Sequence, residues 1–313
     1  MRVWSEIALH VGALILWTGA LFYHSDIPKS EIIEKYGSRD LQSVVVNNDT
    51  VYFAARGEGE TILLLHGTSS FMQTWDAWAR DLEMEYRVVR PDLPGFGLTG
   101  APHNEDFSLE NYLNTLFTLM DTLGIESFHV AGNSFGGYLA TEMALHYPNR
   151  IESLCILNGS GYKLDSLASK KSGFSLASTP IIKDVMRYIT PKFVVRQSLK
   201  SFYGDPDKVS EAVVQRYFDY LLCRDNRKSL VKKSTQNYPP LNGRLADISC
   251  PTLILWGEQD QLIPLAKGRA MATSIPSATL SILSQTGHIP MEEKPNESLV
   301  EYQSFLNQIP FTQ

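Results

Sequence analysis

A serine between two glycines is the feature of this 313-residue sequence that points most clearly to chemistry. The motif G-N-S-F-G, centred on Ser134, follows an apolar run that ends at Ala131 and precedes helix-like residues that begin at Phe135. A turn this sharp needs residues without side chains on both sides of the serine, and Gly132 and Gly136 provide them. The turn would hold the hydroxyl at the N-terminus of a helix, which favours negative charge. We therefore predict that Ser134 is a nucleophile.

A serine hydroxyl is a weak nucleophile at neutral pH, so it needs a histidine base and a third group that orients the histidine. His288 follows a glycine in the loop after one predicted strand, and Asp260 lies in the loop after another. The order serine, acid, histidine is the order expected for a serine on such a turn. We predict Asp260 as the acid and His288 as the base, with Glu258 as the alternative acid. Asn158, at the end of an earlier strand, cannot serve as an acid.

Short apolar or β-branched runs must position these residues, and they alternate with helix-like stretches along most of the chain. A turn-forming cluster at residues 47–49 separates the first two runs, which predicts a hairpin. The alternation predicts an α/β fold with a mostly parallel central sheet flanked by helices. The predicted strands are 41–46, 50–55, 61–65, 86–90, 128–131, 151–157, 252–256 and 279–283, and the predicted helices include 109–123, 138–147 and 298–308.

The strand pattern stops after Gly161 and resumes after Asp247, and the region between them has helical periodicity. Residues 209–222, for example, carry apolar side chains at helical spacing. Because the strands resume, we predict a helical cap inserted after the sixth strand. The predicted organisation is an N-terminal membrane segment (1–25), a stalk with a short helix (26–40), a first core part (41–161), the cap (162–246) and a second core part (247–313).

Residues 7–23 form an apolar stretch that is interrupted only by His10 and is just long enough to cross a bilayer. Arg2 precedes the stretch, and aromatic residues lie towards its far end, as in a signal anchor. We expect membrane association through residues 7–23, with the catalytic domain on the extracytoplasmic side. A cleaved signal peptide and an amphipathic helix that lies on a surface are the alternatives.

The composition is that of an ordinary globular protein, with 43% hydrophobic and 20% charged residues. The net charge of -6, without a dense cluster of basic residues, excludes nucleic acid as a partner. Three scattered cysteines predict buried thiols and neither a disulfide framework nor a zinc site. We expect no metal and no cofactor.

The sequence carries the motifs HGT (66–68), DLPGFG (92–97), GNSFGG (132–137), GEQD (257–260) and TGHIP (286–290). Together they give the chain, over about residues 41–311, a resemblance to the α/β-hydrolase fold family and in particular to its capped single-chain members. The resemblance implies a serine hydrolase of the carboxylesterase or lipase kind, related to C–C bond hydrolases. It also implies two backbone N–H donors in an oxyanion hole, those of Phe135 and Thr68, with Ser69 as the alternative to Thr68.

These residues predict cleavage of an uncharged or amphipathic carboxylic ester, either a small molecule or lipid-like, through an acyl-enzyme on Ser134. The family's dehalogenases and epoxide hydrolases are excluded because they carry aspartate at the nucleophile position. The first alternative is C–C bond hydrolysis of a vinylogous diketone acid, in which Arg216 of the cap would bind the substrate carboxylate. Ile289 argues against it, since those enzymes usually carry tryptophan after the histidine. The second alternative, an inactive hydrolase-fold binding module at a membrane, conflicts with the complete set of catalytic residue types.

Overall fold

The computed structural model describes residues 10, 19, 22–164 and 188–309. Most of the predicted membrane segment, residues 7–23, therefore lies outside the described residues. Within the described residues, no helix is long and apolar enough to cross a membrane. The longest helix among them, α4 (Leu109–Thr122), has 14 residues, whereas a span needs about 20. This finding contradicts the membrane-anchored, extracytoplasmic location expected from the sequence, which depended on the apolar character and the flanking residues of one short stretch.

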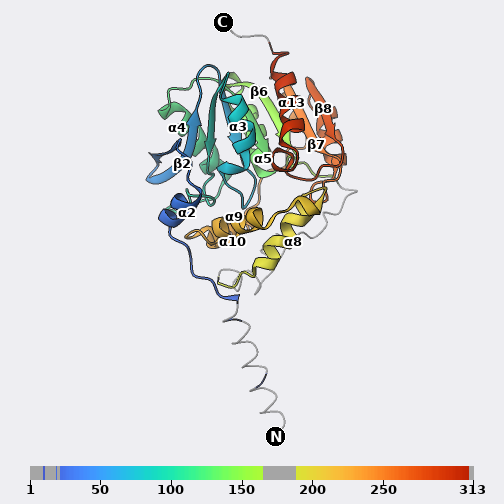
Figure 1. The fold of residues 1–313 in the computed structure, drawn as a ribbon. Helices are drawn as coiled ribbons and strands as arrows, with labels where there is room; N and C mark the ends of the chain where they lie inside the picture. Colours follow the sequence, from blue (N-terminus) through green and yellow to red (C-terminus); the bar gives the residue numbers. More distant parts are fainter. Residues whose placement is uncertain (1–9, 11–18, 20–21, 165–187, 310–313) are drawn as a thin grey trace.

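The part of the chain that the structure describes contains one eight-stranded sheet, in the order β1-β2-β4-β3-β5-β6-β7-β8. β2 runs antiparallel to β1 and β4, and the other neighbouring strands are parallel. The predicted α/β fold with a mostly parallel sheet is thus confirmed (Figure 1). The strands are β1 (Leu41–Val46), β2 (Asp49–Arg56), β3 (Thr61–Leu65), β4 (Arg87–Pro91), β5 (Phe128–Asn133), β6 (Ile151–Leu157), β7 (Thr252–Gly257) and β8 (Ala278–Leu283).

The first two strands form the hairpin that the turn-forming residues predict. Asn47 and Asn48 connect them with φ angles of 50° and 70°. Two central residues with positive φ are the requirement of a type I′ turn, which asparagine tolerates better than most residues.

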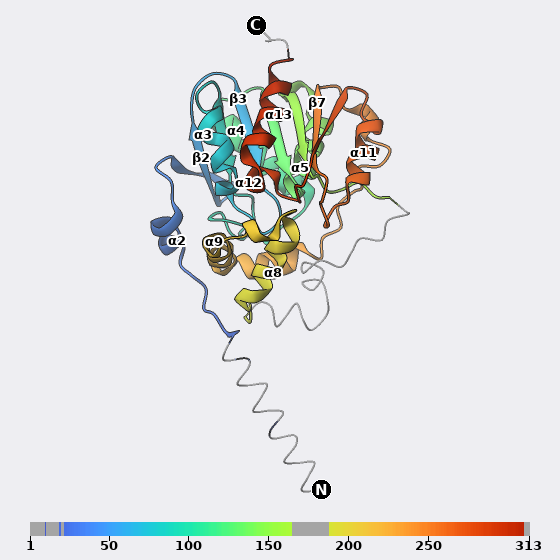
Figure 2. The ribbon, with the colours of Figure 1, turned by 45° about the vertical axis from the view of Figure 1, so that its right-hand side comes forward.

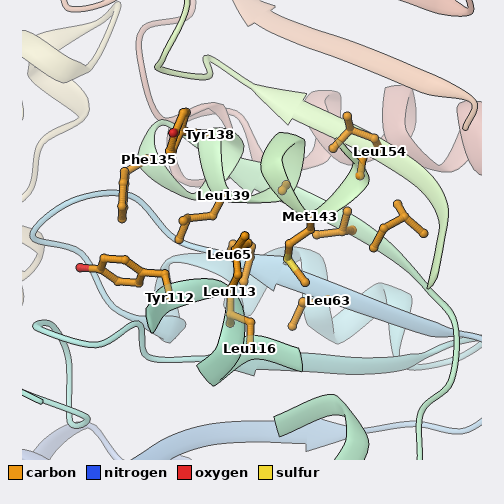
Figure 3. Packing of buried hydrophobic residues seen from close by; sticks show 14 of the residues in the cluster. Leu63, Leu65, Tyr112, Leu113, Leu116, Phe135, Tyr138, Leu139, Met143 and Leu154 are labelled. Atoms are coloured by element: carbon orange, nitrogen blue, oxygen red, sulfur yellow. The ribbon is translucent and has the colours of Figure 1, made fainter. Parts of the chain in front are cut away.

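Successive residues of the central strands point to opposite faces of the sheet, and both faces are covered by helices (Figure 2). In β3, Leu63 and Leu65 belong to the core on one face, whereas Ile62 and Leu64 belong to the core on the other. Figure 3 shows Leu63 and Leu65 packed against side chains of α4 and α5. The first face is covered by α4, α5 (Phe135–His146) and α11 (Leu265–Ser274), and the second by α3 (Asp76–Leu82) and α13 (Pro295–Leu306).

Among the described residues, three α-helices between β6 and β7 form the cap, at the end of the sheet where the parallel strands terminate (Figures 1 and 2). They are α8 (Lys192–Phe202), α9 (Glu211–Leu222) and α10 (Asn226–Lys233). Ser210 begins α9, because its side chain accepts a hydrogen bond from the N–H of Val213 at 3.2 Å. A helical cap inserted after the sixth strand is therefore confirmed.

The segment predicted as a stalk contains α2 (Lys29–Tyr36) and is attached to the cap. Nζ of Lys35 lies 2.6 Å from the carboxylate of Asp219 in α9. Just before α2, Asp26 accepts a hydrogen bond from Arg227 of α10 at 2.5 Å. The cap and the segment that contains α2 therefore pack together at the end of the sheet where the parallel strands terminate.

Candidate active site

Ser134 lies on a sharp turn between β5 and α5, as the motif predicts. Its φ of 56° and ψ of -114° belong to a region that residues with side chains rarely adopt. A Cβ atom at Gly132 would collide with the carbonyl oxygen of Gly136, and one at Gly136 would collide with that of Leu65. The turn therefore needs both glycines, and it exposes the serine side chain at the N-terminus of α5.

Asp260 and His288, which come from the loops after β7 and β8, are in direct contact. Nδ1 of His288 lies 2.8 Å from Oδ2 of Asp260. The other carboxylate oxygen of Asp260 accepts hydrogen bonds from the N–H groups of Leu262 and Ile263, at 2.8 and 2.9 Å. Because a carboxylate can only accept, Nδ1 of His288 carries the proton and Nε2 remains free to accept one.

The alternative acid, Glu258, is exposed and has other partners. Its carboxylate accepts hydrogen bonds from Oγ of Ser284 at 3.0 Å and from the N–H of Gln285 at 3.3 Å. Of the two acids in this loop, Asp260 is the one that contacts His288.

Asn158 supports Asp260, a role that sequence reasoning missed. Its Nδ2 donates to Oδ2 of Asp260 at 2.7 Å, and its Oδ1 accepts from the N–H of Gly257 at 3.3 Å. Asn158 follows β6, which pairs with β7. Because the carboxyl ends of neighbouring parallel strands meet at one edge of the sheet, this position was the available signal.

Asn133, the residue before the nucleophile, connects the serine turn with the histidine loop. Its buried Nδ2 donates to the carbonyl oxygen of His288 at 2.8 Å and to that of Leu157 at 3.2 Å. The loop that carries His288 is therefore held at a fixed place beside the serine turn.

Ser134 and His288 line the same pocket, which has a volume of about 450 Å³. Among the described residues no hydrogen bond joins the serine hydroxyl to His288. Such contacts are often long in unliganded enzymes and shorten when substrate binds. The pocket is also lined by apolar cap side chains, which are Val194, Val195, Leu199, Phe202, Tyr217, Leu221 and Leu230.

The two predicted oxyanion donors lie at this pocket. Phe135 is the first residue of α5, so its N–H has no acceptor within the helix. Thr68 follows Gly67, where an added Cβ atom would lie only 3.2 Å from Cβ of Ser134. Thr68 and its alternative Ser69 both line the pocket, and the loop passes directly beside the serine.

His66 fixes the start of this loop from within the core. Its Nδ1 donates to the carbonyl oxygen of Gly67 at 2.8 Å, and its Nε2 accepts from the N–H of Leu93 at 2.9 Å. Complete burial lowers the pKa of His66 to about 4. His66 is therefore neutral near pH 7 and orients backbone groups.

Arg216, the predicted substrate-binding residue, does not line the pocket. Its Nη2 lies 3.3 Å from Oε1 of Glu292, and its guanidinium group lies 5.5 Å from the ring centre of Phe71. The other oxygen of Glu292 accepts a hydrogen bond from the hydroxyl of Tyr217 at 2.5 Å. Arg216 is thus held by a carboxylate of the protein and is not among the residues that line the pocket.

The cap contacts the histidine loop through backbone groups and one buried carboxylate. The N–H of His288 donates to the carbonyl oxygen of Phe202, at the end of α8, at 2.5 Å. Oε2 of Glu293, in α12 (Pro290–Glu293), accepts from the N–H groups of Gly204 in the cap at 3.0 Å and Gly287 at 2.7 Å. These contacts connect the position of the cap to that of His288.

Comparison with known proteins identifies the family. The family model for the alpha/beta hydrolase fold matches residues 60–295. The chain belongs to this family. Both the matching family model and the eight-stranded sheet identify this chain as a hydrolase of the α/β fold.

Curated relatives of this α/β-hydrolase carry names of two kinds. A 2-hydroxy-6-oxononadienedioate/2-hydroxy-6-oxononatrienedioate hydrolase of Paraburkholderia phymatum is 29% identical over 248 residues, which cover 76% of this chain and 84% of the relative. Lipase 1 of Psychrobacter immobilis is 27% identical over 274 residues, which cover 83% and 82%. The relatives thus include both C–C bond hydrolases and lipases.

The solved structures that resemble this chain also include a phospholipase and a C–C bond hydrolase. A structure described as a membrane phospholipase A superposes with a TM-score of 0.75 at 25% identity, over 98% of this chain and 97% of the other. A meta-cleavage product hydrolase from Pseudomonas fluorescens superposes with a TM-score of 0.74 at 25% identity, over 86% and 98%. The kind of bond that this α/β-hydrolase cleaves must therefore be inferred from its own site.

Proposed function

We propose that this α/β-hydrolase cleaves carboxylic esters through an acyl-enzyme on Ser134, with His288 as base and Asp260 as the orienting acid. The observation that carries the proposal is the 2.8 Å contact between His288 and Asp260 at the pocket that Ser134 also lines. A strained serine on a strand-to-helix turn, a histidine with a free Nε2 and a buried carboxylate are the components of acyl transfer.

The reaction proceeds in two halves. Nε2 of His288 takes the proton of the Ser134 hydroxyl as the oxygen attacks the ester carbonyl, and the same proton then goes to the leaving alcohol. In the second half, His288 takes a proton from water as the water attacks the acyl-enzyme. His288 then gives that proton to Oγ of Ser134 as the bond between Oγ and the acyl carbon breaks and the acid is released. The N–H groups of Phe135 and Thr68 stabilise the oxyanion in both halves, each contributing about 10² to 10³ in rate.

The substrate is a small-molecule or lipid-like ester. Most of the side chains on the cap side of the pocket are aliphatic or aromatic, which suits an apolar chain. A volume of about 450 Å³ lies within the range of ordinary small-molecule sites.

Hydrolysis of a C–C bond is the second candidate, because several relatives carry the names of such enzymes. Their substrates, as the printed names state, are dienoates and dienedioates. The arginine expected to bind such a carboxylate, Arg216, is instead paired with Glu292 and lies outside the pocket lining. The C–C candidate therefore lacks the arginine that it was expected to use.

The test compares substrates on the full chain and on Ser134→Ala. We expect p-nitrophenyl butyrate and octanoate to be hydrolysed, with activity reduced at least 10³-fold in Ser134→Ala, because the nucleophile is lost. Ser201→Ala, which changes an exposed serine of α8, is the matched control and should keep full activity. Faster turnover of a vinylogous diketone acid than of either ester would select the C–C candidate, and no turnover of any substrate would favour an inactive binding module.

A further inference from the structure

The pocket contains a buried lysine near Ser134. Lys233, the last residue of α10, is 8% exposed. Its Nζ donates to Oγ1 of Thr68 at 3.2 Å and lies 3.5 Å from the ring centre of Phe135. The ammonium group therefore lies against both residues that are proposed to donate N–H groups to the oxyanion.

Lys233 lacks the carboxylate partner that a buried cation normally has. Among the described residues, no carboxylate oxygen lies within 4.0 Å of its Nζ, and burial alone lowers its pKa to about 7. Arg90, which is equally buried, shows the contrast, because it is paired with both Asp40 and Asp76. A hydroxyl and an aromatic face offset only part of the cost of burying an ammonium group.

The described residues that line the pocket include a second lysine and no aspartate or glutamate. Lys267 of α11 is half-buried, and burial lowers its pKa also. Lys233 and Lys267 thus face a pocket whose described lining holds no carboxylate, although the whole chain has a net charge of -6. Low-dielectric walls strengthen the attraction between an ammonium group and an anion inside such a pocket.

We propose that Lys233 binds an anionic group of the substrate, a carboxylate or a phosphate, so that this enzyme prefers esters that carry a negative charge near the scissile bond. The inference rests on the proposed ester hydrolysis and specifies its substrate class. An ammonium group has three N–H donors, and one is used by Thr68. The remaining donors can form the charge-assisted hydrogen bonds that a carboxylate or phosphate accepts most strongly. Nζ of Lys233 contacts both Thr68 and Phe135, whose N–H groups are proposed to bind the oxyanion. The anionic group of the substrate therefore lies only a few bonds from the ester carbonyl.

The test is a ratio of two specificity constants measured on the full chain. Mono-p-nitrophenyl glutarate carries a free carboxylate, and methyl p-nitrophenyl glutarate has the same carboxylate capped. We expect Lys233→Met to lower the charged-to-capped ratio of kcat/KM by about tenfold or more, the loss expected for one charge-assisted hydrogen bond. Lys233→Arg keeps the charge and should keep most of the ratio. Lys232→Met is the matched control, since Lys232 is the neighbouring lysine but pairs with Glu105.

A second pair of substrates identifies the source of the anionic group. Dibutyryl glycerol phosphate carries the charge on the alcohol side, and tributyrin is its uncharged counterpart. If the charged member of only one pair is preferred, and Lys233→Met removes that preference, the anion belongs to the acyl side or to the alcohol side accordingly. An equal ratio in the full chain and in Lys233→Met for both pairs overturns the inference.

Binding to Ser134→Ala separates this inference from the proposed function. Calorimetry with monohexyl glutarate measures binding without turnover, and we expect Lys233→Met in this background to weaken it by about tenfold. Binding that depends on Lys233 without any ester turnover by the full chain would overturn the ester hydrolysis alone. Ester turnover that depends on Ser134, with binding indifferent to Lys233, would overturn the role of Lys233 alone.

Discussion

At the scale of single residues, the site depends on how the carboxylate of Asp260 is held. It accepts hydrogen bonds from two backbone N–H groups, from Asn158 and from His288. Oδ1 accepts from the two N–H groups, and Oδ2 accepts from the amide of Asn158. Oδ2 therefore has one lone pair left for Nδ1–H of His288. The carboxylate therefore fixes both the orientation of the imidazole ring and the nitrogen that carries the proton.

Asp260→Asn should abolish most of the activity without unfolding the protein. An amide at this position can offer its NH₂ group to Nδ1 and so favour the wrong tautomer of His288, which in related chemistry costs about 10⁴ in kcat. The measurement is kcat on p-nitrophenyl butyrate, with circular dichroism as the check of folding. Glu258→Gln changes the exposed acid of the same loop and should stay within about twofold of the unchanged chain. Equal losses in the two variants would contradict the assignment of Asp260.

The sequence allowed the positions of Ser134, Asp260 and His288 to be predicted because each follows a strand of a parallel sheet. The ends of such strands lie together whatever covers the sheet. The same argument predicts that Asn158 lies near Asp260, although, from the sequence alone, Asn158 was weighed only as an acid. The position of Lys233 was not predictable from the sequence, because it depends on how α10 packs against the loop after β3.

At the scale of elements, the cap and the histidine loop share the carboxylate of Glu293. It accepts from the N–H groups of Gly204 and Asp205 in the cap and from that of Gly287 in the loop. The glycines are required here, since a Cβ atom at Gly287 would collide with the carbonyl oxygen of Phe202. The loop that carries His288 is therefore positioned by contacts to the cap as well as to the sheet.

Glu293→Gln should loosen this connection. The amide retains one accepting oxygen and turns its NH₂ group towards N–H donors, which leaves buried backbone groups without a partner. We expect kcat on p-nitrophenyl butyrate to fall by about tenfold with KM changed less than threefold, because the change affects the position of His288 more than the pocket walls. Glu297→Gln, an exposed carboxylate of α13, is the control. A change in KM alone would mean that Glu293 acts on the cap and not on His288.

The strands and the hairpin were predictable because their apolar periodicity and turn residues are local signals. The helix after the nucleophile begins at Phe135, as the motif predicts. The predicted helical run starts only at Tyr138, because the glycines that open α5 are poor helix formers used for close packing. The arrangement of the cap helices was not predictable, because it depends on long-range pairs such as Asp219 with Lys35.

At the scale of the whole molecule, an acidic protein has two lysines and no carboxylate among the described residues of its pocket lining, and the pH should control how that pocket selects substrates. Within the described lining, the titratable groups beside Lys233 are Lys267, Tyr217, Tyr238 and His288. Burial lowers the pKa of Lys233 to about 7, so its charge is present below that pH and is lost above it. We expect the ratio of kcat/KM for mono-p-nitrophenyl glutarate over its methyl ester to be highest below pH 7 and to fall as the pH rises.

The ratio is the quantity to measure because any pH effect on the steps that the two substrates share cancels. Lys233→Arg should remove the pH dependence of the ratio, since arginine stays charged. A ratio that is flat from pH 6 to 9 in the unchanged chain would contradict the titration of Lys233.

The same burial predicts an effect on stability. The pKa of Lys233 is lower in the folded chain than in the unfolded chain, so between about pH 7 and pH 10 the unfolded chain binds more protons. The free energy of unfolding contributed by this group therefore rises with pH in that window, and the cost of the buried charge is largest below it. Lys233→Met should raise the thermal midpoint, more at pH 6 than at pH 9. A lower midpoint at pH 6 would show that the ammonium group is stabilising.

The expected membrane location was the part of the whole-molecule prediction that failed. Its basis was the apolarity of residues 7–23, whereas none of the helices in the described ranges can cross a bilayer. Length and apolarity of a short stretch are weaker signals than the motif at Ser134, which combines residue types with the strand and helix around them.

Labelling by an alkyl fluorophosphonate is the sharpest test of Ser134 as the nucleophile of an acyl-transfer site. We expect one label per chain, located by peptide mass spectrometry on Ser134, absent in Ser134→Ala and at least 10²-fold slower to form in His288→Ala. Labelling of another residue, or unchanged labelling of Ser134→Ala, would contradict it.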